Sequence, residues 1–599
     1  MTDQPPAFEP SRWSLADLFP SPDGPEIEAA FKDLDGKISE FEAGRTLLAD
    51  TMPAEAFNRL MEQLQAIYRL AYRLNAFAGL WFSENTQNQS AQTLMARVDQ
   101  VVAGMSNRTL FFTLWWKNLA EAQAGRLMAG SGDLRYWLKQ MRNFKPYTLT
   151  EAEEKIINIK DLTGARAMET LYQSITNRYT FTLEVDGSLQ ELTRGELMVY
   201  ARHHDPAMRQ KAYQELYRVY GNEAPILGQI YQFVVRDWHN ENIDLRQFDQ
   251  AIAPRNLGND IPNEVVDLLL AVCQKNAPLF QRFFRLKARL LGMEKLRRYD
   301  IYAPLGKSDS RYTFNQSVDL VMDAFNRFEP QVAELARRVL AAGHVDSEVR
   351  KGKRGGAFCM TALPDLTPWV LLNFQGRSED VATMAHELGH AVHSQLAAHH
   401  SLLTQHPSLP LAETASTFGE MILTDHLLSQ EKDGQVRRDL LFRQVDDAYA
   451  TILRQAFFAL FERQAHAIIQ AGASIDALSQ AYLENLSAQF GDAVEIGDEF
   501  RWEWVSIPHI FNTPFYVYAY AFGQLLVLSL YQQYLMEGAS FKPRYLSILS
   551  AGGSMAPLDL LLQAGIDIRQ ERFWQGGFDV VRGLVEQLEA LAPAAGPAR

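Results

Sequence analysis

The sequence predicts a mostly α-helical fold, and three observations lead to this prediction. Apolar side chains recur three and four residues apart within segments rich in Ala, Leu, Glu, Gln and Arg, such as residues 57–74. Two sites have the capping-box pattern that opens a helix, with Thr150 followed by Glu153 and Thr193 followed by Glu196. Strand-like patterns are confined to two short regions. We therefore expect a large helical fold with a small β element.

The two β regions differ in kind. Residues 179–185 alternate polar and apolar side chains and are followed by Asp186-Gly187, which predicts a hairpin. Residues 357–361 and 369–374 are short, β-branched or aromatic, and bounded by Gly and Pro. We expect this second pair of strands to lie beside the helix that follows them.

Composition restricts the class of protein. The 599 residues are 47% hydrophobic and 22% charged, which is typical of a globular chain. The formal net charge of −14 argues against a nucleic acid as partner, because nucleic-acid binders usually present a basic face. Cys273 and Cys359 are the two cysteines, which favours reduced thiols. The N-terminal residues do not read as a signal peptide, and the most apolar later stretch, residues 522–530, is too short for a membrane span. We therefore expect a cytoplasmic protein without a membrane partner.

No internal repeat or low-complexity linker divides the chain. The predicted hairpin is the only natural place for a boundary. We expect an N-terminal helical domain over residues 1–190, a second domain over residues 191–590, and a disordered tail over residues 591–599.

One motif carries chemistry. The segment after Ser378 contains HExxH at His386–His390, and Ser378 is placed to cap the helix that holds it. Two histidines four residues apart lie on one helix face and can bind one ion, while Glu387 can reach a water on that ion. Zinc would lower the pKa of that water towards 7, and the carboxylate would take its proton. The alternative is an ordinary amphipathic helix whose histidines are solvated or packed.

A catalytic zinc needs a third protein ligand. The metzincin pattern fails, because residue 393 is His and residue 396 is Leu. We expect a second helix to begin at Pro410, with Glu413 as the third ligand. Glu420 lies on the same face seven residues later. It and Ser416 or Thr417 are candidates for orienting a ligand.

Other histidines near the motif are weaker candidates. His393 lies near the face of His386 and His390, but one helix cannot easily direct three such side chains at one ion. Packing is the more natural role for His393. The same holds for His399, His400 and His406, which are expected in a loop.

Residues 502–523 are strongly aromatic and contain His509 followed by Tyr516, Tyr518 and Tyr520. A tyrosine hydroxyl or a histidine N–H can stabilise the negative oxygen that forms when an amide is hydrolysed. Aromatic clusters are more often packing elements, and the pattern alone leaves both readings open.

The strand before the HExxH helix has two interpretations. Residues 370–374, including Asn373 and Phe374, could bind a peptide backbone as an added strand, which would make them substrate-binding residues. The alternative is a buried strand, and this is the favoured interpretation.

With these residues in view, the chain resembles the oligoendopeptidase F group of the M3 (thimet-type) zinc peptidases. The resemblance rests on RKGKRGGAFC at residues 350–359, NFQGRSEDVATMAHELGHAVH at 373–393, LAETASTFGEMILTDHLL at 411–428 and HIFNTPFYVYAYAFG at 509–523. It implies a large helical metallopeptidase fold with a deep substrate channel that admits short, unstructured peptides, the N-terminal domain forming a channel wall.

The resemblance also implies site residues. One Zn²⁺ is expected on His386, His390 and Glu413, with Glu387 as base and proton shuttle. His509 and Tyr518 become expected partners of the substrate carbonyl, with Tyr516 as a further candidate. The spacing from His509 to the tyrosines is shorter than in the wider family and contains Pro514, so the choice among the tyrosines stays open.

The sequence thus predicts a zinc endopeptidase that cuts internal bonds of short oligopeptides. Two rivals remain. One is a carboxypeptidase or dipeptidyl carboxypeptidase on the same fold, and the other is a peptide-binding protein with a structural metal. The second is disfavoured because closed zinc sites use four Cys or His ligands.

Overall fold

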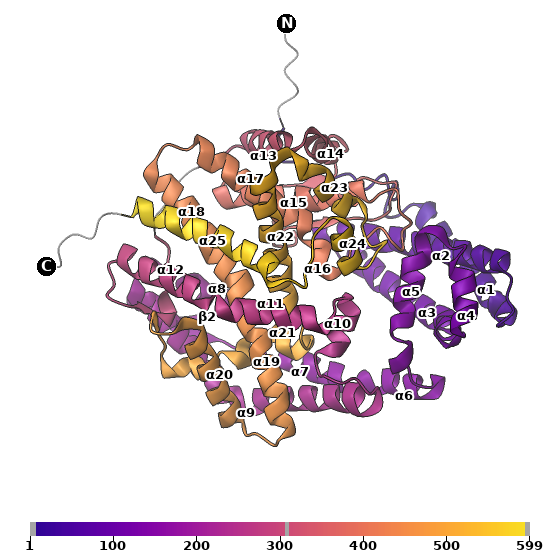
Figure 1. Cartoon of the computed structure of the whole chain (residues 1–599), viewed down its shortest axis with the longest axis horizontal. Coiled ribbons are helices and arrows are strands. Elements are labelled where there is room, and N and C mark those ends of the chain that lie inside the picture. Colours follow the sequence, from indigo (N-terminus) through magenta and orange to yellow (C-terminus); the bar gives the residue numbers. More distant parts are fainter. Residues whose placement is uncertain (1–7, 306–310, 593–599) are drawn as a thin grey trace, which may run out of the picture. The chain divides into compact units, whose positions relative to one another are not determined.

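The computed structural model describes residues 8–305 and 311–592. Within these residues the chain is mostly helical with three small sheets, which confirms the predicted fold class (Figure 1). It divides into two compact units, and each unit is built from three separate segments. The first unit comprises Met1–Lys145, Asp309–Gln430 and Gln533–Ile566; the second comprises Pro146–Ser308, Glu431–Gln532 and Asp567–Arg599.

The expected domain boundary at residue 190 stays a prediction. The expected tail at 591–599 lies almost entirely outside the described residues.

The first unit contains most of the N-terminal helices, the HExxH helix and a three-stranded sheet. Its elements are α1 (Pro25–Ala43), α2 (Ala54–Glu84), α3 (Gln89–Asn118), α4 (Glu121–Met128), α5 (Arg135–Asn143), α13 (Phe314–Phe328), α14 (Pro330–Ala341), β4 (Val345–Asp346), β5 (Phe358–Met360), β6 (Trp369–Leu371), α15 (Ser378–Leu396), α16 (Leu409–Ala412), α17 (Thr414–Gln430), α23 (Lys542–Ser550) and α24 (Pro557–Gln563).

The second unit carries the hairpin and the aromatic segment. Its elements are α6 (Glu151–Asp161), α7 (Ala165–Thr176), β1 (Phe181–Val185), β2 (Ser188–Leu192), α8 (Arg194–Tyr200), α9 (Pro206–His239), α10 (Ala253–Asn259), α11 (Asn263–Lys275), α12 (Ala277–Leu290), β3 (Leu296–Arg297), α18 (Gly434–Ala448), α19 (Arg454–Gln470), α20 (Ile475–Phe490), β7 (Val494–Glu495), α21 (Pro508–Asn512) and α25 (Glu571–Leu591). Helix α22 (Tyr518–Glu537) begins in the second unit and ends in the first.

Apolar spacing places the core of the first unit. In α2, Leu60, Leu64, Ile67, Ala71 and Leu74 follow one another at intervals of four and three residues, and all are buried. This stripe faces apolar side chains of α1 and α3 in one hydrophobic core. The periodicity seen in the sequence is therefore the inward face of α2.

The structure also contains the helix starts and the hairpin that local sequence patterns predicted. Both predicted capping boxes are present, with the Thr150 and Thr193 hydroxyls accepting from the backbone N–H three residues on. Strands β1 and β2 pair antiparallel about Asp186-Gly187, both of which have positive φ. The hairpin prediction is confirmed.

The three-stranded sheet has the order β4-β6-β5, with β4 parallel and β5 antiparallel to β6. Its centre is therefore β6, whose residues 369–371 are fully buried. Both β5 and β6 pack against α15. The predicted β element beside the HExxH helix is confirmed, whereas the two-residue strands β3, β4 and β7 were not predicted.

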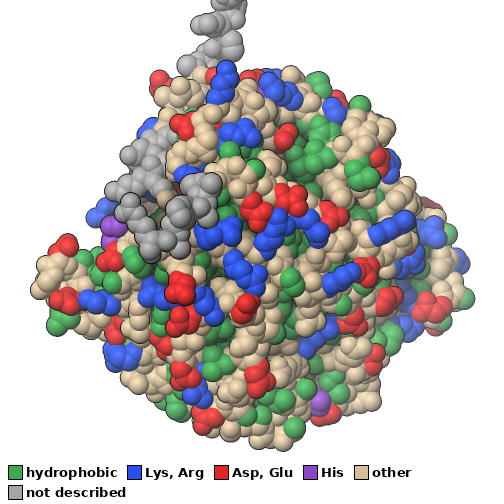
Figure 2. Space-filling view, turned by 60° about the vertical axis from the view of Figure 1, so that its left-hand side comes forward, with side chains coloured by type: hydrophobic (Ala, Val, Ile, Leu, Met, Phe, Trp, Pro, Cys, Tyr) green, Lys and Arg blue, Asp and Glu red, His purple; other side chains and the backbone are tan. Residues whose placement is uncertain are grey.

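No helix among the described residues combines the length and apolar character needed to cross a membrane. On the face drawn in Figure 2, Lys and Arg side chains are interspersed with Asp and Glu. That face therefore presents charges of both signs.

Candidate metal centre

Helix α15 positions three residues of the motif. It begins at Ser378, but its N-cap is Arg377, which corrects the expectation that Ser378 caps it. The Asp380 carboxylate accepts from the backbone N–H groups of Gln375 and Arg377 at 2.9 and 2.8 Å. These bonds satisfy donors at the positive end of the helix and fix where it starts.

Glu413 stands at a break rather than inside one helix. The expected helix from Pro410 is divided into α16, which ends at Ala412, and α17, which begins at Thr414. The break puts Glu413 at the junction, where its carboxylate meets both motif histidines.

Close packing of α15 on α17 brings the two sets of side chains together. A Cβ on Gly389 would lie 2.6 Å from Ser416 Cα and 2.7 Å from Ala415 O, so only glycine fits there. Gly389 is the fourth residue of HExxH and therefore sits between the two histidines. The sequence places a glycine where the two helix backbones touch.

Three atoms converge at this junction. Glu413 Oε2 lies 3.3 Å from Nε2 of His386 and 3.3 Å from Nε2 of His390, and all three ligand atoms lie within 4.8 Å of one another. Zinc bonds of about 2.0–2.2 Å put neighbouring tetrahedral ligands about 3.4 Å apart. These residues could hold a metal ion, and their N/N/O donor set and spacing fit zinc.

Two further side chains hold the ligands in place. The Nδ1–H of His386 donates to Glu420 Oε1 at 2.5 Å, which leaves Nε2 directed at the junction. The Ser416 hydroxyl donates to Glu413 Oε2 at 2.8 Å. Thr417, the other candidate, is buried, and its backbone N–H donates to the Glu413 carbonyl.

The charged groups around His386, His390 and Glu413 favour a positive charge between these three side chains. Burial disfavours the charged ring of His386, but its bonds to Glu413 and Glu420 outweigh burial and raise its pKa to about 10. Burial would raise the pKa of Glu413, but the bonds and charges of His386 and His390 hold it well below the ordinary range. A cation between these groups would be stabilised in the same way.

Glu387 differs from the ligand residues. It is 6% exposed and stands outside the converging group of His386, His390 and Glu413. Burial raises the pKa of its carboxyl, assisted by the negative charges of Glu413 and Glu420 and opposed by the two histidines. A buried carboxylate of raised pKa is suited to accept and return a proton.

His393 does not join the group. It is 4% exposed, and burial, with the nearby His390 and His406, lowers its pKa to about 3. A neutral, buried ring agrees with the packing role that the sequence favoured for His393 over a role as a metal ligand. His400 bonds to Asp133 at 2.7 Å, which ties down the loop that follows α15.

The residues expected to bind substrate beside α15 have structural partners. Both bonds from the Asn373 amide go to backbone carbonyls, at Arg354 and Gly356, and Phe374 packs edge-on against Phe314. Strand β6 is paired on both sides, so an added peptide strand cannot pair with it. The outer strands of this sheet are β4 and β5, and substrate binding by Asn373 or Phe374 stays a prediction.

The aromatic segment lies in the second unit and presents a ring cluster. His509 is exposed and Tyr516 and Tyr520 are half-buried. The His509 ring stacks on Tyr516 at 6.3 Å, and Tyr520 meets both rings edge-on at 6.0 and 5.2 Å. Burial and the charge of Arg454 lower the pKa of His509, which favours a neutral ring that can still donate one N–H.

Tyr518 differs from its neighbours. Its side chain is fully buried, its hydroxyl accepts from Asn259 Nδ2 at 2.8 Å, and burial raises its pKa to about 12. The catalytic role expected for Tyr518 stays a prediction. Exposure favours Tyr516 for contact with a substrate.

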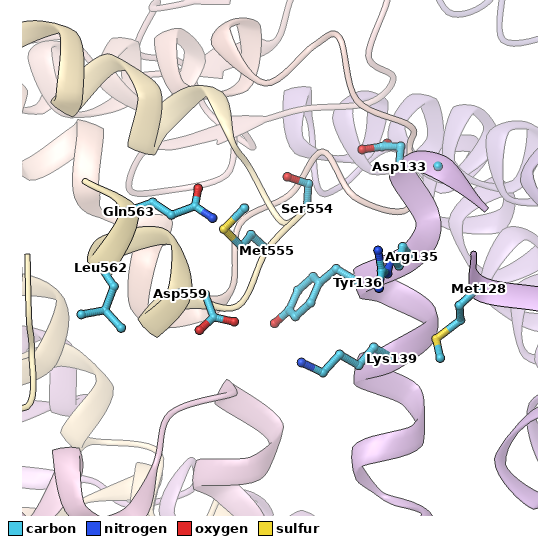
Figure 3. Close-up of a pocket in the computed structure, with 11 residues that line it drawn as sticks. Met128, Asp133, Arg135, Tyr136, Lys139, Ser554, Met555, Asp559, Leu562 and Gln563 are labelled. Carbon is cyan, nitrogen blue, oxygen red and sulfur yellow. The ribbon is translucent and has the colours of Figure 1, made fainter. Parts of the chain in front are cut away.

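Two other features attract attention. The pocket in Figure 3, about 820 Å³, lies in the first unit between α5 and α24, and the predicted metal ligands are not among its lining residues. Asp161, Asp237 and Glu241 also approach one another closely enough for a metal, but this set contains no histidine, and exposed acidic groups are common without an ion.

Comparison with known proteins identifies the family. The model described as Peptidase family M3 matches residues 199–580, and the one described as Oligopeptidase F matches residues 116–181. Oligopeptidase PepF of Bacillus subtilis is 26% identical over 596 residues, covering 97% of this chain and 87% of the relative. Group B oligopeptidase PepB of Streptococcus agalactiae is 27% identical over 545 residues, covering 89% and 88%.

Solved structures agree on the fold. Oligoendopeptidase-F from Enterococcus faecium superposes with a TM-score of 0.72 at 24% identity, covering 94% of this chain and 98% of that chain. PZ peptidase A with an inhibitor superposes with a TM-score of 0.72 at 16% identity, covering 98% and 99%.

Proposed function

Because this chain belongs to peptidase family M3 and is a peptide-bond hydrolase of the oligoendopeptidase F type, we propose that it is a zinc-dependent endopeptidase of short oligopeptides. One observation carries the zinc assignment. His386 and His390 each place Nε2 3.3 Å from the same oxygen of Glu413, which is the spacing of ligands that share one ion.

In this proposal, His386, His390 and Glu413 hold one zinc ion, and Glu420 and Ser416 orient them. When bound, the metal supplies Lewis acidity that acidifies a water and polarises the substrate carbonyl. Glu387 accepts the proton of the attacking water and delivers it to the leaving amine. Its buried position and raised pKa support both transfers.

Hydrogen-bond donors aimed at the developing negative oxygen stabilise it. His509 and Tyr516 are proposed for this role, since both rings reach the surface of their unit, and His509 is favoured in its neutral form. Tyr518 is the less favoured alternative because Asn259 already bonds to its hydroxyl.

Glu387→Gln tests the base. The amide keeps the shape of the side chain but cannot take a proton, so turnover should fall by about 10²–10⁴-fold while zinc content stays at one per chain. Glu379→Gln, on the exposed first turn of the same helix, is the matched control. Near-normal turnover by the zinc-loaded Glu387→Gln protein would show that another group is the base.

A further inference from the structure

The peptide group between Pro514 and Phe515 is held from both sides. Its carbonyl accepts from Arg255 Nε at 3.1 Å, and its N–H donates to Glu462 Oε1 at 2.9 Å. Both partners come from other helices of the same unit, Arg255 from α10 and Glu462 from α19. This peptide group lies directly before Tyr516.

The held peptide is the centre of a β-turn. Tyr516 N–H donates to Thr513 O at 3.1 Å, Pro514 occupies the second position, and Phe515 in the third has φ of 57°. Positive φ at the third position distinguishes a type II turn from a type I turn, and the two types differ by a flip of the central peptide. Type II turns normally have glycine there, so Phe515 opposes the conformation that it adopts.

Each of the two helices makes a second contact one turn further on. In α19, the ring of His466 packs on the ring of Phe515 at 4.4 Å, four residues after Glu462. In α10, Asn259 donates to the Tyr518 hydroxyl, four residues after Arg255. The two residue pairs, one on each helix, therefore hold the chain both before and after Tyr516.

Burying the side chains that hold this turn lowers the stability of the fold. Glu462 is 0% exposed, its Oε2 has no partner within the described part of the chain, and both ring nitrogens of His466 are equally without one. Burying unpaired polar groups costs free energy that apolar side chains would save. Strain and buried polar groups that a fold does not need for packing point to a functional constraint.

We propose that Glu462 and Arg255 are positioning residues that lock the Pro514–Phe515 peptide in its flipped state and thereby fix Tyr516 beside His509. This inference rests on the proposed function, in which Tyr516 and His509 act as donors. In this proposal, Glu462 and Arg255 have a role on the turn and not on the substrate. Each acts on the turn, because a phenylalanine released from the clamp would return to negative φ and move the residue that follows it.

The test compares Glu462→Leu, which removes the acceptor, with Glu462→Gln, which keeps an amide oxygen for the Phe515 N–H. We expect Glu462→Leu to lower kcat by about 10–100-fold with KM changed less than about threefold, since misplacing a catalytic group chiefly affects the transition state. Glu462→Gln should restore kcat to within about threefold of the parent. Arg255→Met should resemble Glu462→Leu, and the double variant should lose little more than either single variant, because both act on one peptide group.

Hydrogen exchange separates failure of this inference from failure of the proposed function. Glu462→Leu should speed exchange over residues 513–520 and leave residues 378–396 unchanged, with or without catalysis. If exchange rises there but Tyr516→Phe and His509→Gln keep full activity, the clamp stands and the donor assignment is wrong. If the leucine variant keeps normal exchange and kcat, or if leucine and glutamine lose kcat equally, the clamp is wrong.

Discussion

At the scale of single residues, the most informative contact is the bond from His386 Nδ1 to Glu420. It fixes the ring so that Nε2 faces Glu413, and it raises the basicity of that nitrogen. Glu420→Ala should therefore weaken zinc affinity by about 10–100-fold, and Glu420→Gln should weaken it less because an acceptor remains.

Competition with a chromophoric chelator measures this affinity. Asp425→Asn, an exposed carboxylate on the same helix α17, serves as the control and should leave zinc binding unchanged. Wild-type affinity in Glu420→Ala would show that the Glu420 contact does not tune the metal.

The buried carboxyl group of Glu462 should make the stability of the folded protein depend on pH. Burial raises its pKa to about 8, against the bond from Phe515 and the charge of Arg255. The folded protein therefore keeps a proton that the unfolded chain releases near its ordinary pKa of 4.5. The stability from this group is complete below that value and is lost as pH rises towards about 8, at about 1.4 kcal/mol per pH unit.

Glu462→Gln cannot titrate, so it removes this dependence. Relative to the parent, the variant should become progressively more stable between pH 5 and pH 8. Thermal melting of both proteins across this range measures the difference. A constant difference in melting temperature would contradict the raised pKa.

At the scale of elements, the approach of α15 to α17 decides whether the proposed metal ligands meet. Gly389→Ala would place a methyl group 2.6 Å from the backbone of Ser416. The helices must separate, which should cost about 1–3 kcal/mol and weaken zinc binding. Gly583→Ala in α25, where nothing lies within 4 Å of the added Cβ, is the matched control and should be neutral or stabilising.

Melting temperature and zinc affinity of the two alanine variants test this point together. Equal behaviour of Gly389→Ala and Gly583→Ala would mean that the close contact does not constrain the site.

Local signals predicted elements well where they were strong. Capping boxes, an Asp-Gly turn and three-four apolar spacing each act within a few residues, so they fixed α6, α8, the hairpin and the inner face of α2. The two-residue strands β3, β4 and β7 have no such pattern, because their pairing partners are distant in sequence. The break at Glu413 was not predicted either, because no helix-breaking residue stands at this position. What accompanies the break is the contact of Glu413 with His386 and His390, which are distant in sequence.

The candidate site was predictable in part. The HExxH motif places two candidate ligands four residues apart on one helix. The carboxylates at 413 and 420 follow in the segment 411–428, which the sequence analysis had also singled out. Glu462 and Arg255 were not found, since their relation to residue 515 is visible only in three dimensions. The available signal was Glu462 itself, the one acidic residue of α19, directly after the apolar run 456–461.

At the scale of the whole molecule, the chain crosses repeatedly between two units, and the three proposed metal ligands all belong to the first. Ligand binding stabilises the state that binds it by about 4 kcal/mol at a thousandfold excess over Kd. Zinc removal should therefore raise hydrogen exchange in α15 and α17, with smaller changes in α19 and α20 of the second unit. Uniform loss of protection in both units would contradict a locally stabilising metal.

The most direct test of the account is cleavage of quenched peptides of graded length, with the cut sites mapped by mass spectrometry before chelation, after chelation and after zinc is restored. A zinc endopeptidase should make internal cuts in short peptides that vanish with the chelator and return with zinc. Cuts confined to the C-terminal end would instead show an exopeptidase. Absence of cleavage by the zinc-loaded protein would contradict the proposed endopeptidase function.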